Sequence, residues 1–270
     1  MQTIIEARKN PFKIDWKEIF AYRDLLWTLT WRDIRVQYAQ TALGLAWAII
    51  NPLLNILLFS FVFGIVAKVD TGNVPHLLFT TVGMCGWTYF STLMTNASNS
   101  IISAQGMVSK IYFPRLIIPL SKAIAAFIDF GISFVILIAM LVYFRFVPSI
   151  NIVFLPFFIF MTVLSGLAGG IWMSALTIRY RDFQHITPLI IRIGMYATPI
   201  AYAASSVPSK YQFLFYLNPV AGIVEGFRWS ILGGKAPDPM SYVSYVVVGL
   251  LFVSGLFYFN KMERTMADIL

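Results

Sequence analysis

The segment QGMVSKIYFPRLIIPLSK, residues 105–122, separates two long apolar runs and decides how the rest of the chain is interpreted. It carries Lys110, Arg115 and Lys122, contains no acidic residue, and holds two prolines five positions apart. Basic residues that flank apolar runs mark the cytoplasmic ends of membrane spans. We therefore predict a cytoplasmic elbow here. Its basic residues either reflect only the orientation of the neighbouring spans, or they belong to a surface that binds a soluble partner.

The composition excludes an ordinary water-soluble domain. Of the 270 residues, 59% are hydrophobic and 12% are charged, which is typical of a polytopic membrane protein. The Lys and Arg residues that give the net charge of +8 flank apolar runs and do not gather on one amphipathic face. The bilayer therefore explains the charge better than nucleic acid does.

Few residues of the chain suit catalysis or metal binding. The single cysteine, Cys85, lies in an apolar run, which excludes an internal disulfide and gives no metal-ligand spacing. His76 and His185 are far apart and flank different predicted loops, so they suit neither zinc nor a catalytic dyad. No G-x-x-x-x-G-K-[ST] loop occurs. We expect no cofactor, no metal and no enzymatic activity in this chain.

The first 42 residues are predicted to form a cytoplasmic segment with an amphipathic helix at the membrane interface. About forty polar-rich residues precede the first apolar run, so we expect no signal peptide. Asp15 and Glu18 form a capping-box-like pattern. At helical spacing one apolar arc contains Trp16, Ile19, Phe20, Trp27, Trp31, Ile34 and Tyr38. A second stripe, Leu25, Leu29 and Val36, is expected to pack on protein.

Residues 43–270 are predicted to be an all-α domain with six transmembrane helices. The apolar runs cover residues 43–67, 77–102, 116–143, 152–177, 187–204 and 241–259. In the outer region 205–239, the stretches 211–217 and 220–232 are too short to span, so we expect re-entrant helices. With the N-terminus inside, fifteen Lys and Arg lie on inner segments and five on outer ones, which predicts that both termini are cytoplasmic.

Polar residues inside the runs mark faces that avoid lipid. Asn51, Pro52 and Asn55 are expected either to face the bundle or a cavity, or to form a packed kink with satisfied amides. Asp129 is an acid deep in an apolar run and therefore a functional candidate. The favoured alternative is that it accepts a hydrogen bond from Lys122 or from a neighbouring helix.

Two further spacings predict contacts between helices and within one helix. Gly166 and Gly170 lie four apart, so close helix packing of the small-xxx-small kind is expected. Glu225 and Arg228 lie three apart on a predicted re-entrant helix, where they are expected to pair.

Aromatic residues number 44 of 270 and are not confined to the ends of the runs. Such rings provide apolar faces on which the C–H faces of sugars stack. Together with Asn51 and Asn55, the candidates to line a path through the membrane are Trp47, Phe59, Phe63, Trp87, Phe90, Tyr196 and Tyr202. For any single ring, lipid-facing or core packing is the default.

Six stretches, in order and with suitable spacing, resemble one family. They are WRDIRVQYAQTALGLAWAIINPL (31–53), SKIYFPRLIIPLSK (109–122), LTIRYRDFQHITPLI (176–190), ATPIAY (197–202), YLNPVAGIVEGFR (216–228) and FNKMERTMADIL (259–270). Together they resemble the membrane subunit of ABC transporter type-2 exporters. Within that family the chain looks like the Wzm-type permeases that export O-antigen, capsule or teichoic-acid chains.

The resemblance implies a cytoplasmic-membrane homodimer joined to two copies of a nucleotide-binding ATPase, which binds ATP and magnesium. It implies export of a polysaccharide carried on undecaprenyl pyrophosphate through a channel at the dimer interface. The coupling loop maps onto residues 105–115, with Lys110, Ile111, Tyr112, Phe113, Pro114 and Arg115 as its candidates.

Two questions stay open at this point. The first concerns the basic residues at the predicted cytoplasmic ends of the helices. They could attract the pyrophosphate, or they could simply be solvated. This basic rim consists of Arg23, Arg32, Arg35, Arg179 and Arg181, with Asp182 beside them. The alternative functions are an ion-coupled secondary carrier or lipid scramblase, and a membrane enzyme acting on lipid-linked sugars. An ion-coupled carrier normally has several ionisable residues within the membrane, and this chain shows only Asp129 there, which counts against the carrier. The sequence shows no pair of catalytic carboxylates and no metal cluster, which counts against the enzyme.

Overall fold

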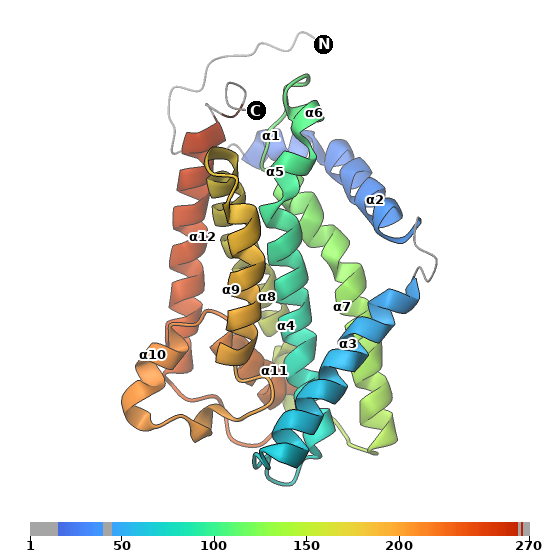
Figure 1. Cartoon of the computed structure of the whole chain (residues 1–270), viewed down its shortest axis with the longest axis vertical. Coiled ribbons are helices and arrows are strands. Elements are labelled where there is room, and N and C mark those ends of the chain that lie inside the picture. Colours follow the sequence, from blue (N-terminus) through green and yellow to red (C-terminus); the bar gives the residue numbers. More distant parts are fainter. Residues whose placement is uncertain (1–15, 40–44, 264–265, 267–270) are drawn as a thin grey trace.

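The computed structural model describes residues 16–39, 45–263 and 266, and within these ranges it contains helices, turns and irregular segments but no strand. The long helices run roughly along one axis and form a bundle (Figure 1). The all-α class is thereby confirmed. The predicted cap at Asp15 and the predicted start of the first span at residue 43 lie outside the described residues.

The predicted interface helix forms as two pieces, α1 (Trp16–Ala21) and α2 (Arg23–Ala39), which meet at Tyr22. Leu29 of the second stripe is buried, as predicted, whereas Val36 of that stripe is exposed. Trp27 and Trp31 of the main arc are also exposed. The helix pair thus packs on the bundle through residues of both stripes, such as Ile19 and Leu29, whereas Trp27 and Trp31 face outward.

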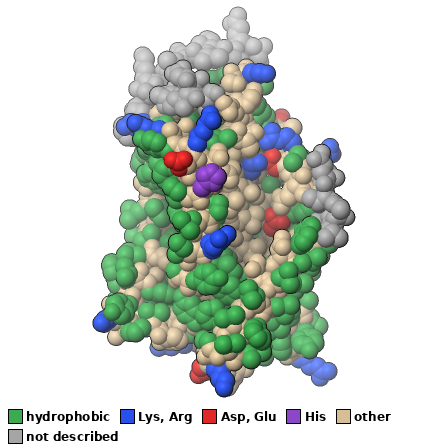
Figure 2. All heavy atoms as spheres, viewed as in Figure 1, with side chains coloured by type: hydrophobic (Ala, Val, Ile, Leu, Met, Phe, Trp, Pro, Cys, Tyr) green, Lys and Arg blue, Asp and Glu red, His purple; other side chains and the backbone are tan. Residues whose placement is uncertain are grey.

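Four helical segments are long and apolar enough to cross a membrane. The first is α3 (Leu45–Phe59), which continues as the π-helix η1 (Ser60–Val66). The others are α7 (Ile117–Tyr143), the short helix η2 (Ile150–Phe154) with α8 (Leu155–Arg179), and α12 (Ser241–Glu263). On the face seen in Figure 2, hydrophobic side chains cover much of the lower half, and charged side chains lie mainly in the upper half and along the lower edge.

The second and fifth predicted spans form α4 (His76–Ser98) and α9 (Phe183–Ala197). At about 1.5 Å per residue, the 23 residues of α4 reach about 35 Å, but the 15 residues of α9 reach only about 22 Å. Most of α4 is buried between α7 and α8, so its surface need not be as apolar as one that meets lipid. The count of six spans stays a prediction.

Short helices close the two ends of the bundle. At one end α5 (Ser100–Ser103) and α6 (Gln105–Val108) follow α4. At the other, η3 (Ala204–Ser206), η4 (Ser209–Tyr211), α10 (Gln212–Tyr216) and α11 (Ala221–Leu232) lie between α9 and α12 without crossing the bundle (Figure 1). The last two match the predicted stretches 211–217 and 220–232 closely.

The core of the bundle is the contact between α4 and α8, where glycines let the helices approach. A Cβ atom built on Gly170 would lie 2.4 Å from Ala97 Cβ, and one built on Gly166 would lie 2.8 Å from Leu93 side-chain atoms. These distances are too short for a side chain at either position. The predicted close packing at Gly166 and Gly170 is confirmed.

Candidate functional site

The first part of the elbow, the predicted coupling loop of residues 105–115, has a buried half that is hydrogen-bonded to the last helix. Phe113 is only 3% exposed and belongs to the main core cluster. The Arg115 backbone N–H donates to Glu263 Oε1 at 3.0 Å, and the Arg115 guanidinium donates to the Glu263 carbonyl. Because Glu263 ends α12, the elbow is connected to both α7 and α12.

The tip of the elbow is exposed. Ile111 is 60% exposed and Tyr112 is 52% exposed, and Lys110 beside them is exposed too. The Tyr112 hydroxyl lies 3.4 Å from Glu18 Oε1 of α1. The six predicted coupling residues therefore divide by position: 110–112 present a surface, whereas 113–115 hold that surface to the bundle.

The predicted basic rim consists of two separate groups. Arg23, Arg32 and Arg35 are exposed on α2, with Arg32 bonded to Asp33 at 2.9 Å. Arg179, Arg181 and Asp182 are exposed in the turn between α8 and α9. In Figure 1, α2 lies on the opposite flank of α5 and α6 from α9. The structure brings the two groups to the same end of the bundle but not into one cluster.

Polar contacts fasten α2 to α7. Lys122 Nζ lies 2.8 Å from Asp33 Oδ2, and both side chains are largely shielded from solvent. One turn earlier on α2, the Thr30 hydroxyl points to the Ser121 carbonyl at 3.5 Å. Lys122 therefore pairs with Asp33, which the sequence analysis had not singled out. The sequence did contain a signal for this pair, since Asp33 lies outside the apolar arc of the predicted helix.

Asp129 accepts hydrogen bonds from the end of α2. The Tyr38 hydroxyl donates to Asp129 Oδ1 at 2.7 Å, and Gln37 Nε2 donates to Asp129 Oδ2 at 3.1 Å. Burial, with the hydrogen bond to Asp129, raises the pKa of the Tyr38 phenol well above its ordinary value. Of the two predicted donors to Asp129, the neighbouring helix is the one observed.

A stripe of predicted lining residues runs along α3 and into η1 at intervals of four. Its members are Trp47, Asn51, Asn55, Phe59 and Phe63. Since four residues turn an α-helix by about 40° beyond a full turn, the stripe rotates by about 120° between Trp47 and Phe59. Trp47 and Asn51 line a polar cavity beside α7, whereas Phe59 faces α9.

Aromatic rings from α3, η1, α9, the loop after α9 and α10 form a ladder. The Phe59 ring stacks on Tyr196 and on Phe63, with centroids 5.6 Å apart in each case. The ring centroids of Phe63 and Tyr202 lie 6.4 Å apart, and those of Tyr202 and Phe215 also lie 6.4 Å apart. Four of the seven aromatic candidates therefore lie together, on elements distant in sequence.

Trp87 and Phe90 lie apart from this ladder. Their rings are 5.3 Å from each other, and both are buried on α4. They line an apolar cavity of about 530 Å³ together with residues of α8, α9 and α12. Their position is that of core residues, which was the default expectation for any single aromatic.

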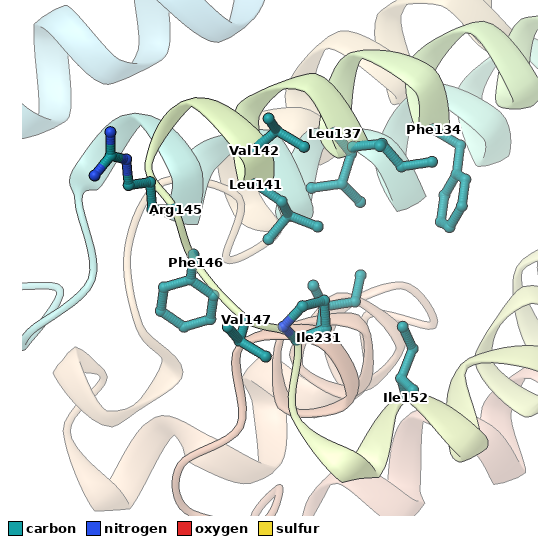
Figure 3. A pocket seen from close by; sticks show the side chains of 11 residues that line it. Phe134, Leu137, Leu141, Val142, Arg145, Phe146, Val147, Ile152 and Ile231 are labelled. Carbon is teal, nitrogen blue, oxygen red and sulfur yellow. The ribbon is translucent and has the colours of Figure 1, made fainter.

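A second apolar cavity, of about 470 Å³, lies near the far end of α7. It is lined by Phe134, Leu137, Leu141 and Ile231 among others, with Arg145 its one charged lining residue (Figure 3). Its lining offers almost no polar groups for orienting a polar substrate. Among residues 16–39, 45–263 and 266, no group of three or more His, Cys, Asp or Glu is placed to hold a metal ion.

Glu225 and Arg228 of α11 have different hydrogen-bond partners. Arg228 is buried and donates to the carbonyls of Ile200 at 2.6 Å and Tyr202 at 3.1 Å. Glu225 accepts from the Tyr216 hydroxyl at 2.5 Å. In place of the predicted direct pair, the arginine fixes the loop after α9 and the glutamate fixes α10.

The fold and this arrangement of residues define a class of protein. It is an all-α protein with four helical segments long and apolar enough to span a membrane, a basic end, a polar cavity within the bundle and an aromatic ladder. The ABC-2 type transporter family model matches residues 24–232. The chain belongs to this family.

Several of its relatives have names that refer to polysaccharide transport. It is 30% identical over 248 residues to an O-antigen export system permease protein RfbA of Klebsiella pneumoniae, which covers 92% of this chain and 95% of the relative. It is 25% identical to the RfbA protein of Myxococcus xanthus, over 92% and 96% of the two chains. It is 22% identical to the polysialic acid transport protein KpsM of Escherichia coli, over 87% and 92%.

Proposed function

We propose that this chain is the transmembrane subunit of an ATP-driven exporter that moves lipid-linked polysaccharide across the cytoplasmic membrane through a homodimeric channel. Family membership and the names of the relatives support the polysaccharide substrate. Those relatives are permeases and transport proteins and not enzymes, which fits the lack of an ATP-binding loop.

One observation carries the proposal: the exposed surface of α3. Asn51 and Asn55 are both exposed on a helix that is apolar enough to span a membrane. An amide facing hydrocarbon without a partner is costly, so this face is best matched to a water-filled path or to a second copy of the chain. Because the same stripe continues into the aromatic ladder, it suits the passage of sugars, whose C–H faces stack on rings.

ATP is hydrolysed, in this proposal, by two copies of a separate subunit that contacts residues 110–112. Closure of that subunit pushes the elbow, and the anchored residues 113–115 transmit the push to α7 and α12. The proposal also takes both termini to be cytoplasmic; in support of this, α1 and the C-terminal end of α12 lie at the same end of the bundle as the elbow (Figure 1).

The proposal also assigns positions or roles to the α2 tryptophans, the two arginine groups and the short helices α10 and α11. In this proposal Trp27 and Trp31 of α2 lie at the membrane interface, where tryptophan is enriched. The two arginine groups attract the pyrophosphate of an undecaprenyl-linked substrate to the cytoplasmic face. Helices α10 and α11 re-enter the membrane from the outer side.

The variant Ile111→Asp tests the coupling. A charge in the middle of an apolar docking surface is expected to lower export at least about tenfold, because burying an unpaired carboxylate costs more than the contact gains. Membrane insertion should be unchanged, since Ile111 is exposed. The measurements are polysaccharide at the cell surface, permease in the membrane fraction, and ATPase that copurifies with the permease.

Lys210→Ala and Lys235→Ala serve as controls at the opposite end of the bundle, where both side chains are exposed. They should leave export and copurification intact. Unchanged export by Ile111→Asp would remove the coupling role. Loss of ATPase binding in the two lysine variants, with none in Ile111→Asp, would mean that the orientation is inverted.

A further inference from the structure

The polar cavity beside Asp129 lies among α2, α3, α4 and α7 and measures about 290 Å³. Besides the Asp129 carboxylate, its lining provides amides from Gln37, Asn51 and Asn96 and hydroxyls from α4 and α7. The Trp47 side chain forms one wall and is 46% exposed. A cavity of this chemistry within a membrane bundle is expensive unless something polar occupies it.

Two polar groups in the lining, one hydroxyl and one carbonyl, lack their usual partners. Ser133 Oγ is buried and makes no hydrogen bond, although serine hydroxyls in helices commonly bond to a carbonyl one turn back. Pro52 has no N–H, so the Ala48 carbonyl receives no helical bond from residue 52. Both Ala48 and Pro52 line the cavity. A buried polar group without a partner, as Ser133 Oγ is, indicates a missing ligand or water.

The one acidic side chain in the cavity lining, Asp129, forms no ion pair with any residue that the structure describes. Asp129 receives its described hydrogen bonds from the neutral groups of Tyr38 and Gln37, and no Lys or Arg lines the cavity. Lys122, the nearest basic residue along α7, is bonded to Asp33. A phosphate or pyrophosphate group would be repelled here, whereas a donor of several neutral hydrogen bonds would be attracted.

We propose that this cavity binds one neutral, hydroxyl-rich sugar unit of the exported polymer. The inference rests on the proposed function. Vicinal hydroxyls donate to Asp129 and accept from the amides of Asn51 and Asn96, while Trp47 covers a C–H face of the ring. The volume lies at the lower limit of about 300 Å³ for small-molecule sites, so it suits a single sugar unit and not a stretch of polymer.

The position of the cavity connects it to the path proposed above. Trp47 and Asn51 belong to both the cavity and the α3 stripe, and the stripe leads through Asn55 to Phe59 and the ladder. A sugar bound at Asp129 would therefore occupy the elbow-side end of that path, at the junction of α2 and α7. It would also compete with Tyr38 and Gln37 for the carboxylate, which links occupancy to the contact between these helices.

Saturation-transfer NMR on the permease–ATPase complex in lipid nanodiscs tests the site. The probes are D-glucose, D-galactose, D-mannose, L-rhamnose and N-acetyl-D-glucosamine, each added singly. At least one should give a saturable signal, and Asp129→Asn should weaken its affinity about tenfold, since a hydrogen bond to a charged group is lost. Ser133→Ala should weaken it several-fold without disturbing the fold, because Ser133 Oγ bonds to no other group.

Ser165→Ala is the matched control. Ser165 Oγ is also buried without a partner, but it lines the apolar cavity beside Trp87, so sugar affinity should not change. The absence of a saturable signal from all five sugars overturns the proposal, as does a signal that Asp129→Asn and Ser133→Ala leave unchanged. Saturable binding of sodium alone, lost in Asp129→Asn, would assign the cavity to a cation. A complex that binds sugar but exports no polysaccharide would refute the proposed function and not the site.

Discussion

Replacing Gly170 with leucine is expected to prevent the permease from folding. The added Cβ would lie 2.4 Å from Ala97 Cβ, and the rest of the leucine would have to separate α4 from α8. Overpacking costs about 1–3 kcal/mol where side chains can move aside, and more where the obstacle is fixed to backbone, as Ala97 Cβ is. Such a loss is a large part of a typical stability of about 5–15 kcal/mol. Fluorescence-detected size exclusion should show little monodisperse protein.

A glycine-to-leucine change at another position tests whether the effect at Gly170 comes from the helix contact and not from leucine itself. A Cβ on Gly131 of α7 meets nothing within 4 Å, so Gly131→Leu should give normal yield. The milder Gly170→Ala should lower the melting temperature, and Ala97→Gly in the same chain should restore most of it, because the clashing atom is then absent. If Gly170→Leu folded as well as Gly131→Leu, the α4–α8 contact described above would be wrong.

The helix boundaries were largely predictable because apolar runs in a membrane protein must end where polar residues begin. The predicted run 116–143 became Ile117–Tyr143, and 220–232 became Ala221–Leu232. The run that became α9 did not predict a full crossing as clearly, since Pro188 and Arg192 interrupt it, and the 15 residues of α9 are short for a bilayer. Sequence periodicity likewise did not reveal that the interface helix would divide at Tyr22.

Contacts between helices were harder to predict, because spacing identifies the faces of one helix and not the helix it meets. Lys122 had Asp129 as a candidate partner two turns along α7, yet it pairs with Asp33 on α2. Glu225 and Arg228 have the spacing of an ion pair, but tertiary partners satisfy each of them separately. Which rings joined the ladder depended on how α9 lies against α3, and periodicity contains no information about that.

Replacing Arg228 with methionine is expected to destabilise the end of the bundle that contains α10 and α11. Arg228 is buried, donates to the carbonyls of Ile200 and Tyr202, and lies 3.7 Å from the centroid of the Phe79 ring. Methionine fills similar space but donates nothing, so both carbonyls lose a charged donor. At about 1–3 kcal/mol for each acceptor left without its donor, the loss is about 2–6 kcal/mol, reduced to the extent that removing a buried charge is itself favourable.

Thermal unfolding of the purified protein measures this loss, and two further variants identify its cause. Lys235→Met removes an exposed charge from the same end of the bundle and should leave the melting temperature unchanged. Arg228→Lys keeps the charge, but a single ammonium lacks the planar fork that reaches two carbonyls, so its melting temperature should fall between those of wild type and Arg228→Met. If Arg228→Lys matched wild type, charge alone would account for the stabilisation. If Arg228→Met matched wild type, the two hydrogen bonds would contribute nothing, and the loop after α9 would have to be held by Asn218, which donates to Thr198 Oγ1 at 2.8 Å.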